Sequence, residues 1–208
     1  MIQSSLILFE QYGFHGVSVN QIVEDVGTSK GGFYHHFTSK DELLFEIHDT
    51  FITHVLEKGI YAYETHHSPT RKLQAIVKEF VNVFGLYKAH ISVFYQESTY
   101  LKQQYQKSVK DKRDQFKQIV MRTIEEGKKS GEFREELSVE ITTMAILGMV
   151  NWIYKWYRQS GANTMEEIGD IFVDLILHAV LQTETISKDN YKEILLDLPF
   201  FAKGNRND

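Results

Sequence analysis

The sequence predicts an all-α protein. Apolar residues recur at spacings of three and four along most of the 208-residue chain, as on one face of an α-helix. Only two prolines, Pro69 and Pro199, stand among them, which favours long helices. No stretch alternates apolar and polar residues as a half-buried strand would. We therefore expect helices throughout, without a sheet.

The first two helices can be delimited from their ends. Apolar residues at 2, 6 and 9 predict a short helix that ends near Gly13, where glycine can adopt a left-handed conformation. Residues 18–21, SVNQ, form a capping box that opens a second helix. Gly27 is expected to end it.

The third helix is short and the fourth is long. Thr28 or Ser29 can cap a helix that runs through Phe37. Residues 39–42, SKDE, form another capping box and open a long helix. A tight turn with one glycine joins the second and third helices, which is helix-turn-helix spacing.

Longer helices follow from residue 67 onward. Pro69 suits the first position of a helix, and the box at 164–167, TMEE, opens a late one. The expected segments are 70–88, 91–101, 103–129, 138–157, 164–183 and a short helix at 191–196.

Composition indicates a globular protein. The chain is 42% hydrophobic and 25% charged and has no cysteine, which excludes disulfides and thiolate metal sites. No signal peptide is evident at the N-terminus, and the longest uncharged apolar-rich run, 141–154, is too short to span a membrane. We expect a cytoplasmic protein without a membrane partner.

The charge balance does not suggest nucleic-acid binding. The net charge is −5, and residues 1–66 carry three lysines against nine carboxylates. A nucleic-acid interface in this part must therefore depend on where the charges lie rather than on their sum.

The stretch 27–40, GTSKGGFYHHFTSK, leaves three kinds of site to consider. A phosphate-binding loop would need a preceding strand and a GKS or GKT sequence, and both are missing. A metal site is disfavoured because the adjacent His35 and His36 diverge by about 100° on a helix. We predict no metal and no cofactor, and this leaves a surface laid against nucleic acid.

Features of this stretch suit that surface. Gly31 and Gly32 each cost about 1 kcal/mol of helix stability relative to alanine, and small residues permit close approach to a groove. Lys30 and Lys40 can reach a phosphate or a base edge. Tyr34 lies one turn after Lys30 on the same face.

Other groups complete the expected surface. His35 can contact DNA as donor or acceptor, while His36 is expected to support the fold. Phe33 and Phe37 are expected in the core. The free N–H groups near Ser39 form a natural phosphate seat.

Residues 17–44, VSVNQIVEDVGTSKGGFYHHFTSKDELL, resemble the helix-turn-helix of the TetR family of bacterial regulators. The ordered motif G-x-S-K-G-x-F-Y-x-x-F-x-S-K-x-x-L-L carries the resemblance, which covers about residues 2–55. It implies a recognition helix that begins at Lys30 and a phosphate contact at Lys40. The residues that it implies for DNA binding are Ser18, Asn20, Thr28, Ser29, Lys30, Gly31, Gly32, Tyr34, His35 and Lys40.

This sequence departs from the family pattern in two places. Gly32 stands where members often have threonine, serine or alanine, so it offers no side chain for base readout. Members also usually carry a basic extension before the first helix, whereas Met1 lies almost on that helix here.

The resemblance implies two domains: residues 1–48 bind DNA, and residues 49–208 bind a ligand and dimerise. A homodimer is expected because one short helix reads too few base pairs. The last two long helices would form its interface as a four-helix bundle, unless their stripes pack inside one subunit. The interface candidates are Ala145, Gly148, Trp152, Trp156, Ile168, Phe172, Leu175 and Ala179.

Aromatic residues concentrate in the middle helices, where they form either plain core or an apolar pocket for a small effector. The candidate lining residues are Phe80, Phe84, Tyr87, Phe94, Tyr95, Phe116 and Trp152. The segment 151–158, NWIYKWYR, is similar to members that respond to acyl-CoA or fatty acids. On that resemblance, Lys155 or Arg158 would meet a phosphate, although each also suits a solvated helix end.

The sequence thus predicts a ligand-responsive transcriptional regulator, a repressor that a small apolar effector releases from operator DNA, and no enzyme. One alternative is a helical interaction module without DNA binding. Another is a metal–carboxylate bundle enzyme, which would need Glu-x-x-His pairs facing inward from two helices, an arrangement that the sequence does not provide.

Overall fold

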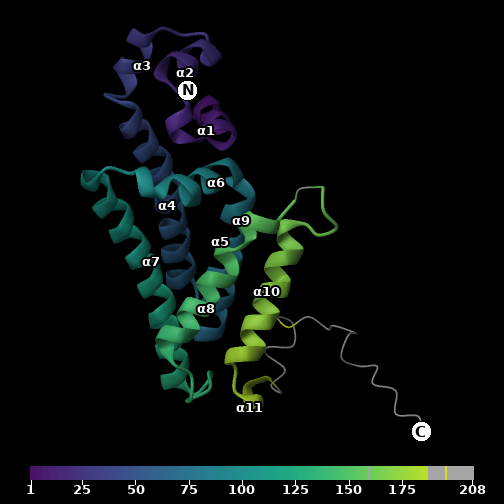
Figure 1. The fold of residues 1–208 in the computed structure, drawn as a ribbon. Coiled ribbons are helices and arrows are strands. Elements are labelled where there is room, and N and C mark those ends of the chain that lie inside the picture. Colours follow the sequence, from purple (N-terminus) through teal and green to yellow (C-terminus); the bar gives the residue numbers. More distant parts are fainter. Residues whose placement is uncertain (159, 187–194, 196–208) are drawn as a thin grey trace.

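The computed structural model describes residues 1–158, 160–186 and 195. Within them the chain is all-α, as predicted, and its only strand-like feature is an isolated bridge between Phe133 and Leu181. Of the helix expected at 191–196, all but Leu195 lies outside the described residues. A small three-helix unit sits at one end, and a larger helical bundle forms the rest (Figure 1).

The N-terminal unit contains α1 (Ile2–Gly16), α2 (Val19–Val26) and α3 (Lys30–His36). The helical path of α1 breaks at Gly13, whose φ of 73° lies in the left-handed region. The Ser18 capping box forms as predicted, and Gly27, with φ 71°, ends α2. The turn between α2 and α3 therefore follows from Gly27, which ends α2, and from the Ser29 hydroxyl, which caps α3.

Helix α4 (Lys40–Thr65) leads from this unit into the bundle. Ser39 caps it, because its hydroxyl accepts a hydrogen bond from the Glu42 N–H at 3.1 Å. The Glu42 carboxylate instead accepts from the N–H and hydroxyl of Thr38. Only half of the predicted capping box forms, since Thr38 competes for the carboxylate.

The bundle surrounds α4. Helices α5 (Pro69–Leu86), α6 (Lys88–Glu97) and α7 (Gln103–Ser130) pack against it, and the short η1 (Ser98–Tyr100) follows α6. Helix α1 packs on α6, so the N-terminal unit also contacts the bundle beside the α4 connection. The prediction for 91–101 begins too late, because α6 already starts at Lys88.

The last helices cover one side of the bundle (Figure 1). They are α8 (Val139–Asn151), α9 (Ile153–Trp156), α10 (Met165–Val180) and α11 (Thr183–Ile186). The single helix predicted for 138–157 is interrupted at Trp152, after which α9 forms only one turn. Helix α10 packs on α5, while α8 packs on α7.

Candidate nucleic-acid interface and ligand cavities

Helix α3 is held from one side and free on the other. The Ser29 hydroxyl caps it by accepting from the Gly32 N–H at 3.1 Å. The Phe33 side chain is fully buried, and its ring packs on Phe37 with centroids 5.6 Å apart. The opposite side of the helix is exposed and carries Lys30, which has no ion-pair partner among the described residues.

Most residues predicted to bind DNA lie on the surface of the N-terminal unit. The exposed ones are Ser18, Asn20, Thr28, Ser29, Lys30, Gly31, Tyr34 and His35, while Gly32 and Lys40 are half-buried. The hydroxyls of Ser18 and Ser29 already serve as helix caps. His36 is exposed rather than supporting the fold, because it lies at the open end of α3.

The absence of a side chain at Gly32 leaves room for the Thr28 hydroxyl. A Cβ atom there would lie 2.5 Å from the Thr28 hydroxyl oxygen, so a larger residue would require that hydroxyl to turn away. Next to it, Gly31 is open, with only the Ser29 hydroxyl near its would-be Cβ at 3.5 Å. The N-terminal end of α3 therefore has no side chain at either position, so its backbone can approach a partner closely.

Lys40 is engaged with the end of α1. Its Nζ donates to the carbonyl oxygens of Phe14 and Val17, each at 2.7 Å, and lies 4.2 Å from the centre of the Phe14 ring. Burial lowers the pKa of the Lys40 ammonium. An ammonium has three N–H donors, so one remains for a phosphate.

The acidic balance of residues 1–66 is partly offset by lysines from later helices. Asp41 pairs with Lys102 at 2.9 Å, and Asp49 pairs with Lys112 at 2.5 Å. Both carboxylates belong to α4, whose chain leads away from α3 (Figure 1). The sum of charges thus overstates the negative charge near the recognition helix.

A cavity of about 300 Å³, here called the central cavity, lies between α4 and its neighbours. Its apolar wall includes three aromatic rings from three helices, Phe51, Phe80 and Phe94. Phe116 of α7 completes the wall, and its ring packs directly on Gly59, where a Cβ would lie 2.6 Å away. The full lining is Phe51, Ile52, Val55, Phe80, Phe94, Tyr95, Arg113, Asp114, Phe116, Lys117, Met144, Leu147, Gly148 and Asn151.

A few polar groups interrupt this wall. Burial raises the pKa of the Tyr95 hydroxyl, which donates to Asn151 Oδ1 at 2.6 Å. Helix α7 contributes the cations Arg113 and Lys117 and the carboxylate of Asp114, which pairs with Lys110 at 2.7 Å. The Arg113 guanidinium lies 5.8 Å from the centre of the Phe94 ring. An apolar cavity with a few polar groups is the usual makeup of a small-molecule site.

The residues predicted to line a ligand pocket separate into two groups. Phe80, Phe94, Tyr95 and Phe116 line the central cavity. Phe84 faces a different cavity, Tyr87 packs on His54 with ring centroids 4.9 Å apart, and Trp152 is 61% exposed on the outer surface. The sequence pattern missed Arg113 and Lys117, although their spacing from Phe116 places all three near one face of α7.

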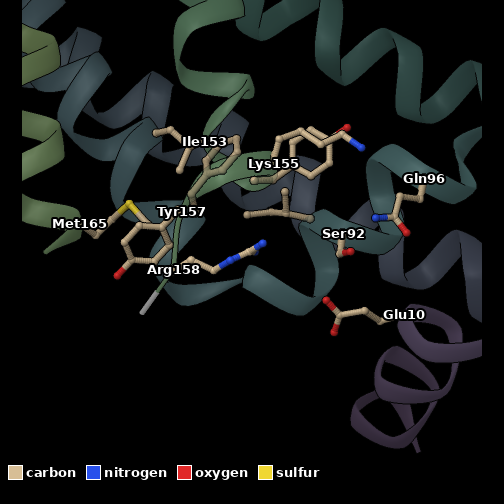
Figure 2. A pocket seen from close by; sticks show the side chains of 11 residues that line it. Glu10, Ser92, Gln96, Ile153, Lys155, Tyr157, Arg158 and Met165 are labelled. Carbon is tan, nitrogen blue, oxygen red and sulfur yellow. The ribbon is translucent and has the colours of Figure 1, made fainter. Parts of the chain in front are cut away.

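A second cavity, here called the junction cavity, has a volume of about 240 Å³ and lies where α1 meets the bundle. Figure 2 shows Glu10 of α1 on one side, with Ser92 of α6 above it, and Arg158 on the other side. Its lining is Glu10, Phe84, Ile91, Ser92, Gln96, Ile153, Tyr154, Lys155, Tyr157, Arg158 and Met165. Glu10 was not a sequence candidate, because nothing along the chain relates it to residues 84–165.

Helices α8, α9 and α10 expose apolar side chains on the outside of the bundle. Helix α8 packs on both α9 and α10, and the ring centroids of Trp156 and Phe172 lie 6.5 Å apart. We call these residues the apolar face: Ile141, Met144, Ala145, Gly148, Trp152, Trp156, Phe172, Leu175 and Ala179. Among the predicted interface residues, Ile168 alone is buried in the chain's own core, at 3% exposure.

Neither a metal-binding group nor a membrane-spanning helix is found among the described residues. Among the described residues no group of three His, Cys, Asp or Glu side chains is placed to hold a metal ion. No helix formed by these residues has both the length and the apolar character needed to cross a membrane.

Comparison with known proteins gives relatives of similar length. The transcriptional repressor KstR2 of Mycobacterium tuberculosis is 22% identical over 182 residues, which cover 86% of this chain and 90% of that protein. The solved structure of the TetR family regulator PfmR from Thermus thermophilus superposes with a TM-score of 0.80 at 27% identity, covering 85% and 96% of the two chains. A structure of AibR in complex with isovaleryl coenzyme A and operator DNA gives 0.75 at 22% identity, covering 84% and 94%.

Family models match both parts of the chain. The model for bacterial regulatory proteins of the tetR family matches residues 2–47, which contain α1 to α3. The model for the tetracyclin repressor-like C-terminal domain matches residues 66–180, which is more than half of the chain. With its helix-turn-helix followed by a helical bundle, this chain belongs to the TetR family of bacterial transcriptional regulators.

Proposed function

We propose that this regulator is a cytoplasmic homodimeric repressor that leaves operator DNA when a small apolar effector fills the central cavity. One observation supports the proposal most directly. The recognition helix, whose N-terminal end is exposed and has no bulky side chain at its two glycines, is joined by a single helix, α4, to the wall of an apolar cavity. Several relatives with a similar sequence are themselves repressors.

In this proposal α3 enters the major groove with its N-terminal end first. Gly31 and Gly32 let the backbone approach the bases, Lys30 and His35 contact base edges or phosphates, and Tyr34 donates to a phosphate. Ser18, Asn20, Thr28 and Ser29 contribute secondary contacts, and Lys40 uses its remaining N–H on a phosphate. Two protomers would place two α3 helices in successive grooves.

The coupling to effector runs along α4. Its first residue, Lys40, is fixed to the N-terminal unit, whereas Phe51, Ile52 and Val55 line the central cavity. We place the boundary between the DNA-binding unit, 1–48, and the effector domain, 49–208, within this helix. An effector that prefers a displaced α4 would lower operator affinity by its differential binding to the two conformations.

The effector class that we favour is an acyl-CoA thioester or a fatty acid. Phenylalanine rings suit an acyl chain, and the cations Arg113 and Lys117 suit a carboxylate or phosphate. AibR, which has a similar fold, has been solved with isovaleryl coenzyme A and operator DNA. Because the central cavity holds about 300 Å³, only the acyl chain of a coenzyme A thioester would lie inside it.

Effector binding can be tested by DNA release. In fluorescence anisotropy with DNA from upstream of the protein's own gene, we expect short- to medium-chain acyl-CoA to release the wild type. Leu147→Trp should fill the central cavity, so this variant should bind DNA normally and lose at least tenfold in effector sensitivity. Free coenzyme A is the matched control and should release neither protein. Release of both proteins at the same acyl-CoA concentration would place the effector elsewhere.

A further inference from the structure

The junction cavity is separate from the central cavity. No residue lines both, and only the junction cavity receives a side chain from the DNA-binding unit, Glu10 of α1. Its other walls come from the bundle (Figure 2). A molecule bound there would touch both parts of the regulator at once.

One part of the junction cavity is apolar. Phe84, Ile91 and Ile153 are at most 2% exposed, and Met165 of α10 joins them. These side chains come from four different helices, so the surface that they form is fixed by the packing of the bundle. It suits a short aliphatic group.

The other part carries opposite charges on facing sides. Arg158 and Lys155 lie at the α9 end, and Glu10 lies across the cavity on α1, with its carboxylate directed inward (Figure 2). Neither Arg158 nor Glu10 forms an ion pair with another described residue, whereas the Lys155 ammonium lies 4.9 Å from the centre of the Tyr154 ring. Glu10, Lys155 and Arg158 are all exposed, so this side of the cavity opens to solvent between a guanidinium and a carboxylate.

We propose that the junction cavity binds an α-amino acid with an aliphatic side chain. The ligand carboxylate would accept hydrogen bonds from the Arg158 guanidinium, which matches it with paired donors. The ligand ammonium would face Glu10, and Ser92 and Gln96, which line the same cavity, would supply further polar contacts. The aliphatic group would lie on Phe84, Ile91 and Ile153.

The size of the cavity agrees with this ligand. Its volume of about 240 Å³ lies below the range of about 300–1,000 Å³ that is usual for drug-sized pockets, so it suits a small ligand such as leucine. A zwitterion also uses both charges, whereas a simple carboxylate would leave Glu10 unmatched. The proposal does not depend on the effector assigned to the central cavity, because the two cavities share no lining residue.

Binding is tested by calorimetry with the full-length protein, without DNA. We expect saturable binding of L-leucine, and binding at least tenfold weaker for its two half-analogues, 4-methylpentanoate and 3-methylbutylamine. Because the measurement needs no operator, its failure would leave the DNA-binding proposal untouched. A wild-type protein that gives no saturable heat with leucine up to about 10 mM would overturn the proposal.

Variants locate the site. Arg158→Gln and Glu10→Gln should each weaken leucine binding at least tenfold, while Lys110→Gln and Glu125→Gln, exposed positions on α7, should leave it unchanged. Leu147→Trp in the central cavity should also bind leucine normally. Circular dichroism checks that each variant is folded. Equal leucine affinity in wild type and Arg158→Gln would contradict the site, and 4-methylpentanoate binding as tightly as leucine would contradict the role of Glu10.

Discussion

Lys30 is the exposed cation at the start of the recognition helix, and it has no partner within the described part of the chain. Lys30→Ala should weaken binding to operator and unrelated DNA alike. If each protomer loses one phosphate contact, the slope of log K against log salt should fall by about two units for the dimer. Anisotropy titrations at several salt concentrations measure it. Lys110→Ala, which removes an α7 lysine paired with Asp114, is the control, and equal slopes for both variants would contradict the assignment.

We assign two roles to the Lys40 side chain: it anchors the end of α1, and it contacts a DNA phosphate. Because its ammonium holds the Phe14 and Val17 carbonyls, Lys40→Ala should destabilise the chain by about 2 kcal/mol and lower the melting temperature by about 4–8 °C. If its third N–H also contacts a phosphate, the salt slope should fall as well. Thermal unfolding and anisotropy separate the roles. An unchanged melting temperature would contradict the anchoring role, and an unchanged slope would contradict the phosphate contact.

His48 is a buried titratable group on α4. Its Nδ1 donates to the Leu44 carbonyl at 2.9 Å, its Nε2 has no hydrogen-bond partner among the described residues, and its ring lies 5.1 Å from that of Phe94. Burial, with a smaller contribution from the nearby charge of Arg113, lowers the His48 pKa from 6.5 to about 4. The unfolded chain therefore binds this proton more readily than the folded one.

The stability contributed by neutral His48 should accordingly be present above pH 6.5 and be lost as the pH falls towards 4. The change in unfolding free energy over this range is about 3 kcal/mol. Denaturant titrations of wild type and His48→Gln at several pH values measure it. The wild type should lose more stability than the variant, and parallel pH profiles would show that another group, such as His90, dominates.

For single residues, the sequence predicted which side chains are exposed better than it predicted which residues they contact. The motif around Lys30 and Tyr34 placed both on the surface of the N-terminal unit, where the structure has them. It could not reveal that Lys40 reaches Phe14, because that contact joins positions 26 residues apart. For the same reason Glu10 and Arg158 gave no signal along the chain, although they line one cavity.

Among the helices, caps and glycines were the reliable signals. Ser18, Gly27 and Thr164 delimit helices as expected because each satisfies local hydrogen bonds that depend on few neighbours. No capping residue or glycine marks the break at Trp152. Trp152 keeps a right-handed helical conformation, so no local sequence signal predicts the interruption.

The apolar face of α8, α9 and α10 is the element-scale feature with the clearest consequence. Trp152 and Leu175 are 61% and 50% exposed, and so many exposed apolar side chains on adjacent helices are typical of an interface. We expect Leu175→Glu to shift the sedimenting species from a dimer towards the 24.3 kDa monomer and to weaken operator binding. Tyr61→Glu, which alters an exposed aromatic on α4, should remain dimeric. A monomeric wild type at micromolar concentration would contradict this interface.

At the scale of the whole molecule, two arrangements depend on parts that are distant in sequence. The central cavity takes residues from α4 to α8, and the sequence predicted four of its aromatic residues but not Phe51 or the cations Arg113 and Lys117. The acidic balance of residues 1–66 is partly compensated by Lys102 and Lys112, which lie beyond residue 100 and pair with carboxylates of α4. Neither arrangement follows from local periodicity, because both require the packed bundle.

The central claim is that two copies of the chain bind a specific DNA site through α3. The most direct measurement is the anisotropy of labelled DNA from upstream of the protein's own gene, compared with scrambled DNA of the same composition at 150 mM salt. We expect the protein to bind the upstream DNA at least about 10³-fold more tightly than the scrambled DNA, with two protomers or a multiple of two per site. Equal affinity for both DNAs, or tight binding by a Tyr34→Ala/Lys30→Ala double variant that matches the wild type, would contradict it.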